Sequence, residues 1–99
     1  MGQANYMAAK AGFAMGRLLA TPGALKALEE AGQAPFRLLV RHQSGDWGDL
    51  SEADRRLNDE ALVHKTRLFS AYRLKTGVKV WVITEADRCA TTFLLPSEY

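Results

Sequence analysis

The chain has 99 residues, of which 47% are hydrophobic and 24% are charged, and its formal net charge is +2. This length allows one domain with one hydrophobic core, and the composition excludes an intrinsically disordered chain. A net charge this small gives no argument for nucleic acid or an anionic membrane as a partner.

Two further features narrow the class of protein. No apolar run approaches membrane-spanning length, because Lys10 and Arg17 interrupt the N-terminal stretch. Cys89 is the only cysteine, so an internal disulfide is impossible and a reducing compartment fits best. We therefore expect a cytoplasmic protein that does not associate with membranes.

The first 20 residues are weakly patterned. Residues 1–15 are rich in alanine, which favours a helix, but little in them would anchor one. We expect a loosely ordered N-terminal arm there and a single domain over residues 16–99. Residues 16–20 fit either the end of a helix or a short strand.

Three helices are predicted next, at residues 22–31, 35–43 and 51–64. Thr21 can cap the first, and Pro22 suits its first helical position. Pro35 opens the second in the same way, although the apolar run 38–40 would also suit a buried strand. Ser51 begins the capping signature of the third helix.

Beyond residue 65 the apolar period changes to two. This alternation predicts strands over residues 67–74, 78–84 and 91–95, joined by short turns. Such strands form an antiparallel meander, which must bury one face. The expected fold is α+β, with the N-terminal helices packed on a C-terminal three-stranded antiparallel meander; a short fourth strand near residue 17 would extend it.

Charge is unevenly distributed along the chain. Residues 46–60 hold six acids and two arginines, a balance of −4, whereas residues 61–79 hold five bases and no acid. Mutual neutralisation within the fold is the favoured interpretation. The alternative is that the two stretches face different partners.

The densest polar segment is the loop of residues 44–49, Ser-Gly-Asp-Trp-Gly-Asp. A catalytic interpretation groups His42, Asp46 and Glu85 around a metal ion or a labile proton, as in a small hydrolase or nuclease. Their spacing matches no compact metal signature, and no cofactor motif is present. The structural alternative is favoured: Asp46 caps or braces a turn, and Trp47 fills the core. As a binding site, the loop would use Asp46 and Trp47, and the turn after residue 84 would use Asp87 and Arg88.

A basic hairpin at residues 65–79 is the second candidate site. Its candidate binding residues are Arg73, Lys75 and Lys79. With Trp81, Tyr72 and Phe93 as an aromatic platform, it would resemble a single-strand nucleic-acid binder. Against this, Tyr72 shares a strand face with Leu68 and is therefore expected to be partly core.

Two further polar features have a structural and a functional interpretation. Asn58 lies one position round from the apolar stripe of the third helix, and we expect it to hydrogen bond the neighbouring sheet or loop. At residues 84–88, Arg88 either presents its guanidinium to a phosphate or carboxylate, or pairs with the turn acids Glu85 and Asp87.

An ordered series of motifs runs through residues 16–99. The motifs are residues 20–25 (ATPGAL), 41–48 (RHQSGDWG), 57–62 (LNDEAL), 70–72 (SAY), 81–88 (WVITEADR) and 91–99 (TTFLLPSEY). This series resembles a family of small, uncharacterised bacterial proteins described as plasmid-related. The chain departs from it at residues 64–66, where a glycine is common, and at Cys89, where serine is common, which argues against catalysis at those positions.

The resemblance implies an accessory protein of a mobile genetic element, without implying a reaction. The favoured function is non-enzymatic binding of another macromolecule, with a host protein preferred over nucleic acid, and no cofactor or metal is expected. A small sheet also leaves an exposed edge, which the N-terminal arm could cover in a second subunit. This predicts a homodimer.

Overall fold

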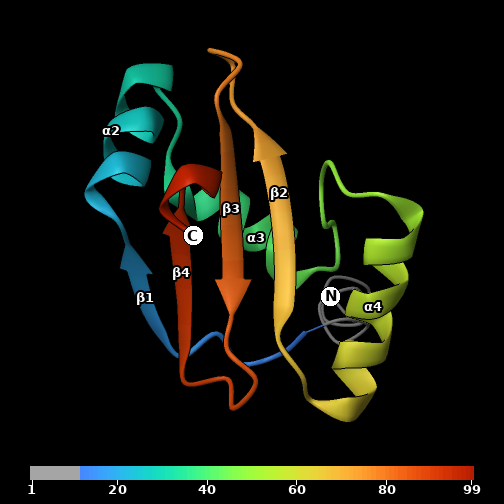
Figure 1. Cartoon of the computed structure of the whole chain (residues 1–99). Coiled ribbons are helices and arrows are strands. Elements are labelled where there is room, and N and C mark those ends of the chain that lie inside the picture. Colours follow the sequence, from blue (N-terminus) through green and yellow to red (C-terminus); the bar gives the residue numbers. More distant parts are fainter. Residues whose placement is uncertain (1–11) are drawn as a thin grey trace, which may run out of the picture.

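The computed structural model describes residues 12–99 as a four-stranded sheet with three α-helices (Figure 1). In chain order the elements are β1 (Arg17–Ala20), α2 (Pro22–Ala31), α3 (Pro35–Gln43), α4 (Glu52–His64), β2 (Leu68–Arg73), β3 (Lys79–Thr84), β4 (Ala90–Leu94) and the 3₁₀ turn η1 (Pro96–Glu98). The predicted α+β class and all three predicted helices are confirmed. The expected N-terminal arm lies largely outside the described residues.

The helix ends follow from local side chains. Thr21 Oγ1 accepts a hydrogen bond from the Ala24 N–H at 3.1 Å, and Ser51 Oγ accepts one from the Asp54 N–H at 3.1 Å. Each bond satisfies an amide that has no partner within its own helix. Helix α2 ends at Ala31 and is capped by Gly32, which adopts the left-handed conformation with φ of 64°. These are the local signals from which the helices were predicted.

The sheet has the strand order β1-β4-β3-β2. Strands β2, β3 and β4 form the predicted antiparallel meander. The short strand near residue 17 also exists, but β1 runs parallel to β4, with Leu18 opposite Thr91. The sheet is therefore mixed rather than purely antiparallel. A parallel partner requires a long crossover, and here all of α2, α3, α4, β2 and β3 lie between the two strands in the sequence.

Helices α2 and α3 cover one face of the sheet, and α3 lies behind the strands in Figure 1. Alternate residues of each strand point to this face, so it collects the main core. The core residues are Ala24, Ala27, Leu28, Leu38, Leu39, Tyr72, Leu74, Val80, Val82 and Phe93.

Helix α4 lies beside β2 at one edge of the sheet (Figure 1). The Asn58 side chain, which is only 3% exposed, donates to the Phe69 carbonyl at 2.6 Å and accepts from the Phe69 N–H at 3.0 Å. One residue pair further along, the Ala71 N–H donates to the Trp47 carbonyl and the Ala71 carbonyl accepts from the Asp49 N–H. The edge of β2 is thus closed by its own chain, and the expected bond from Asn58 to the sheet is confirmed.

The opposite edge is formed by β1. Among the described residues this strand pairs only with β4, and its side chains Leu18 and Leu19 are 54% and 41% exposed. None of the helices described is long and apolar enough to cross a membrane.

Candidate functional site

His42 is completely buried between α3 and the sheet. Its Nδ1 lies 2.5 Å from Ser70 Oγ, and its Nε2 lies 2.9 Å from Thr84 Oγ1. Thr84 Oγ1 is in turn 2.7 Å from Thr91 Oγ1, which donates to the Met15 carbonyl at 2.8 Å. The buried chain of polar groups therefore joins α3, three strands and the segment before β1.

The last hydrogen bond of this series determines which group donates and which accepts in each of the others. A carbonyl can only accept, so Thr91 donates its single hydroxyl hydrogen to Met15 and must accept from Thr84. Thr84 then accepts from Nε2–H of His42, and Nδ1 is left to accept from Ser70. The ring is neutral with its proton on Nε2. Burial lowers the pKa of His42 to about 4, which fits this assignment.

The loop of residues 44–49 is held in place by hydrogen bonds and packing within the fold. The Asp46 carboxylate receives two bonds from the Arg41 guanidinium, at 2.7 and 3.2 Å, and one from the Gly48 N–H at 3.3 Å. The Arg41 hydrogen bond lowers the pKa of Asp46. Gly48 has φ of 78°, and a side chain there would collide with the Ala71 carbonyl. Trp47 is buried against Ala61 of α4, as its structural interpretation predicts.

The turn between β3 and β4 is organised by Arg88. Its guanidinium donates to the backbone carbonyls of Ala61, Thr66, Glu85 and Ala86, at 2.7–3.1 Å. Of the two interpretations of Arg88, the pairing with the turn acids is not formed among the described residues: Glu85 offers its backbone oxygen, and the Asp87 carboxylate accepts from the Cys89 N–H. The Ala61 carbonyl also accepts from the N–H groups of Lys65 and Thr66 where α4 ends, so Arg88 ties this end of the helix to the turn.

His42, Asp46 and Glu85 do not assemble into a site. His42 has no exposed surface, Asp46 is held by Arg41, and Glu85 is exposed in the β3–β4 turn. Within residues 12–99, no group of three His, Cys, Asp or Glu side chains could hold a metal ion. The lone thiol, Cys89, is exposed beside Asp87, whose hydrogen bond raises its pKa and so favours the unreactive thiol form.

The basic hairpin is partly neutralised. The Asp49 carboxylate lies 3.6 Å from the Arg73 guanidinium and 3.7 Å from the Lys79 ammonium. The acidic and basic stretches therefore meet, as the favoured interpretation of their charges predicts. Lys75 is exposed in the turn, where its backbone N–H donates to Gln33 Oε1. These pairs are exposed, so each contributes little to stability.

The aromatic platform expected from Trp81, Tyr72 and Phe93 is not formed. Tyr72 and Phe93 point to the face under the helices and are 1% and 3% exposed, whereas Trp81 points to the other face. The tyrosine hydroxyl donates to the Asp46 carbonyl at 2.7 Å. Strand alternation explains the separation, because Val82 pairs with both Ser70 and Phe93 on the buried side.

A different set of aromatic rings lies on the second face of the sheet. The Trp81 ring packs edge-on against Phe69 at 5.0 Å and against Tyr99 at 5.5 Å between ring centroids. Phe69 and Trp81 are half-buried and Tyr99 is exposed. No α-helix of residues 12–99 crosses this face of the sheet, whereas α2 and α3 cover the opposite face (Figure 1).

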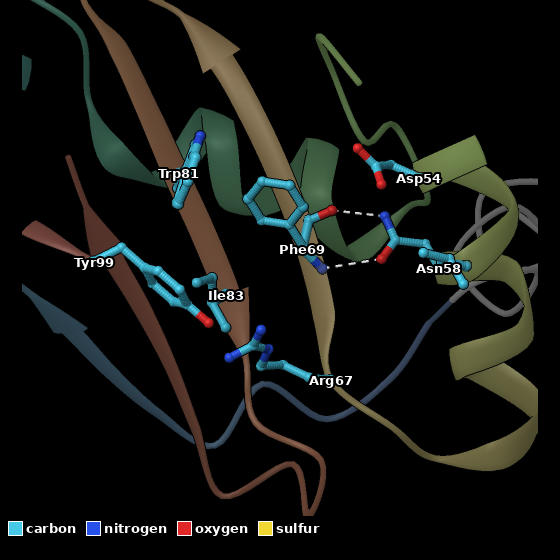
Figure 2. Close-up of a pocket in the computed structure, with 8 residues that line it drawn as sticks. Asp54, Asn58, Arg67, Phe69, Trp81, Ile83 and Tyr99 are labelled. Carbon is cyan, nitrogen blue, oxygen red and sulfur yellow. Dashed lines mark hydrogen bonds between the residues drawn. The ribbon is translucent and has the colours of Figure 1, made fainter. Parts of the chain in front are cut away.

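These rings line a groove of about 310 Å³ between α4 and the segment after β4. Figure 2 shows Phe69 and Ile83 along its floor, Tyr99 on one side and Asn58 of α4 on the other. Leu57 of α4 also lines it and is 61% exposed. The groove joins an apolar floor to three aromatic rings, and we take it as the candidate site.

No family model, curated protein or solved structure matches this chain.

The sequence contains a signal for this groove in its two central strands. In β2 and β3 both alternating sets contain large apolar residues, so that Phe69, Trp81 and Ile83 lie on one side and Leu68, Val80 and Val82 on the other. A strand with one solvent-facing side normally carries polar residues there. Apolar residues on both sides indicate that the second face is also covered, by the chain or by a partner.

Proposed function

We propose that this protein is a non-enzymatic binding protein that receives a partner protein on the second face of its sheet. The groove formed by Phe69, Trp81, Tyr99 and Leu57 is the observation that carries the proposal. Exposed apolar concavities with polar rims mark protein interaction sites, and tryptophan and tyrosine are enriched among the residues that dominate binding energy.

The wider context is proposed from the resemblance alone. An accessory protein of a mobile genetic element meets the proteins of its host, so a host protein of the cytoplasm is the favoured partner. This proposal requires no metal, cofactor or reaction.

Nucleic acid is the second candidate, because the second face also carries basic residues near its aromatic rings. Arg73 and Lys79 share this face with Trp81. However, both already face Asp49, and the rings meet edge-on at 87° and 68° rather than forming parallel surfaces on which bases could stack. Protein is therefore the favoured class of partner.

Site-specific photocrosslinking on α4 tests the proposal. Leu57 and Val63 are both highly exposed, at 61% and 74%, but only Leu57 lines the groove. A photoreactive phenylalanine analogue at position 57 is expected to crosslink this protein to a partner protein in host cells that carry the mobile genetic element. The same analogue at position 63 is the matched control and is expected to give no such adduct.

Two results would count against this function. Equal adducts from positions 57 and 63 would mean that the groove has no special role. An adduct at position 57 that nuclease removes and protease leaves intact would identify nucleic acid as the partner instead.

The homodimer remains part of the proposal, and the edge of β1 is the surface that supports it. Leu18 and Leu19 are exposed on a strand that pairs on only one side among the described residues. Antiparallel pairing of two such edges would join two sheets into one. Light scattering over a concentration series is expected to show a dimer, and Leu18→Pro is expected to shift it towards monomer; a monomer at every concentration would reject the dimer.

A further inference from the structure

Two residues of opposite charge line the groove, one at each end. Figure 2 shows Asp54 at the end near the start of α4 and Arg67 at the other end, below Phe69 and Ile83. The chain explains this separation, since α4 runs from Asp54 down to His64 and β2 returns from Leu68 in the opposite direction. The apolar floor lies between the two charges.

Neither charge is neutralised by the described part of the chain. The Arg67 guanidinium lies 5.4 Å over the Tyr99 ring, and neither a hydrogen bond nor an ion pair from it to residues 12–99 is present. The other arginines near the sheet differ, because Arg73 faces Asp49 and Arg88 is bonded to carbonyls. Among residues 12–99, Arg67 thus keeps its hydrogen-bond donors available for an anion.

Asp54 is half-buried and has no ion pair among the same residues. In a complete capping box its carboxylate would accept from the Ser51 N–H. Only the reciprocal bond, from the Asp54 N–H to Ser51 Oγ, is formed in the described structure. The carboxylate lines the groove instead, where it can accept from a cationic group.

We propose that the groove recognises an extended peptide segment in which one large apolar side chain lies between an acidic and a basic residue. The apolar side chain packs on Phe69 and Ile83, the acidic residue meets Arg67, and the basic residue meets Asp54. This inference rests on the proposed function, because it specifies the partner segment that the same groove binds.

The shape of the groove supports a peptide of this kind. About 310 Å³ is at the lower end of the ~300–1,000 Å³ typical of ligand sites, which suits a side chain rather than a whole helix. The rings of Phe69, Trp81 and Tyr99 all line the groove, and aromatic rings pack favourably against an entering aromatic or aliphatic group. A negative charge at Asp54 would repel a nucleic-acid backbone running through the groove.

Selection from a random dodecapeptide library displayed on phage tests the inference, with the full chain as bait. Enriched peptides are expected to carry a large apolar residue between an acidic and a basic one. A synthetic peptide of the enriched sequence is then measured against charge variants. Arg67→Glu is expected to weaken it about fivefold to tenfold, and exchanging the peptide's acid for lysine is expected to restore binding to that variant.

Two matched variants serve as controls. Arg37→Glu makes the same charge change on α3, under the opposite face, and is expected to leave the affinity unchanged. Leu57→Glu blocks the groove and Val63→Glu does not, although both place an acid at an exposed position of α4. All the substituted positions are exposed, and thermal melting confirms that each variant is folded.

The outcomes separate this inference from the proposed function. Peptides that need Leu57 but show no charge pattern, or that ignore Arg67→Glu, overturn the inference and leave the groove as a protein site. Peptides indifferent to Leu57→Glu, or no enrichment at all, overturn both. Displacement of the peptide by a single-stranded oligonucleotide would overturn both and assign the groove to nucleic acid.

Discussion

Replacing His42 with leucine is expected to lower the free energy of unfolding at pH 7.5 by about 2–4 kcal/mol. His42 is fully buried, and each of its ring nitrogens bonds a hydroxyl, Ser70 on β2 and Thr84 on β3. Leucine fills much of the space but leaves the Ser70 hydroxyl without that partner. A buried polar group that loses its partner costs about 1–3 kcal/mol.

The same residue makes stability depend on pH. Burial lowers the pKa of His42 to about 4 in the folded chain, against about 6.5 when unfolded. The unfolded chain therefore binds the proton more readily between these values, so the stabilisation is complete above about pH 6.5 and is lost as the pH falls towards 4. The shift corresponds to about 3 kcal/mol, because one pKa unit is worth about 1.4 kcal/mol.

Urea unfolding at pH 7.5, 6, 5 and 4 measures both effects. The wild-type and His42→Leu curves are expected to differ most at pH 7.5 and to converge near pH 4. His64→Leu, at the exposed histidine that ends α4, is the control and is expected to follow the wild type. Parallel wild-type and His42→Leu curves over this range would show that His42 does not carry the pH dependence.

Asn58→Leu is expected to cost about 2–4 kcal/mol, because it removes both partners of the Phe69 backbone at once. Leucine is close to asparagine in size, so the loss comes mainly from hydrogen bonding rather than from a cavity. The freed N–H and carbonyl would also leave part of the β2 edge unpaired. An unpaired edge promotes association between sheets, so the variant is also expected to aggregate more readily.

Hydrogen exchange distinguishes this explanation from a general loss of stability. The Phe69 amide is expected to exchange faster in Asn58→Leu, whereas the Ala71 amide, which donates to Trp47, keeps its partner. Asp59→Leu changes the exposed neighbour on α4 and is expected to leave both amides unchanged. An unaltered Phe69 amide in Asn58→Leu would contradict the role assigned to Asn58.

The candidate site was only partly predictable. The loop of residues 44–49 has the charged residues and glycines typical of a site. Its side chains are instead used within the fold, since Asp46 pairs with Arg41 and Trp47 is buried. The groove was missed because its residues come from α4, β2, β3 and the segment after β4. Nothing in the local pattern around Tyr99 indicates that its ring meets Trp81, since that contact depends on the path of the whole chain.

The amino-acid sequence by itself determined the local elements. Threonine, serine and proline at helix starts and the change of apolar period after residue 65 act over a few residues, and the helices and the three strands of the meander formed where those signals lie. Tertiary structure decided what depends on distant contacts. Contacts of this kind place β1 parallel to β4 and determine which of the two apolar faces the helices cover. They also bring His42 to the hydroxyls of residues 28 and 42 positions away in the sequence. Both faces of β3 are apolar, so only the packing of remote helices could determine which became core and which became the groove.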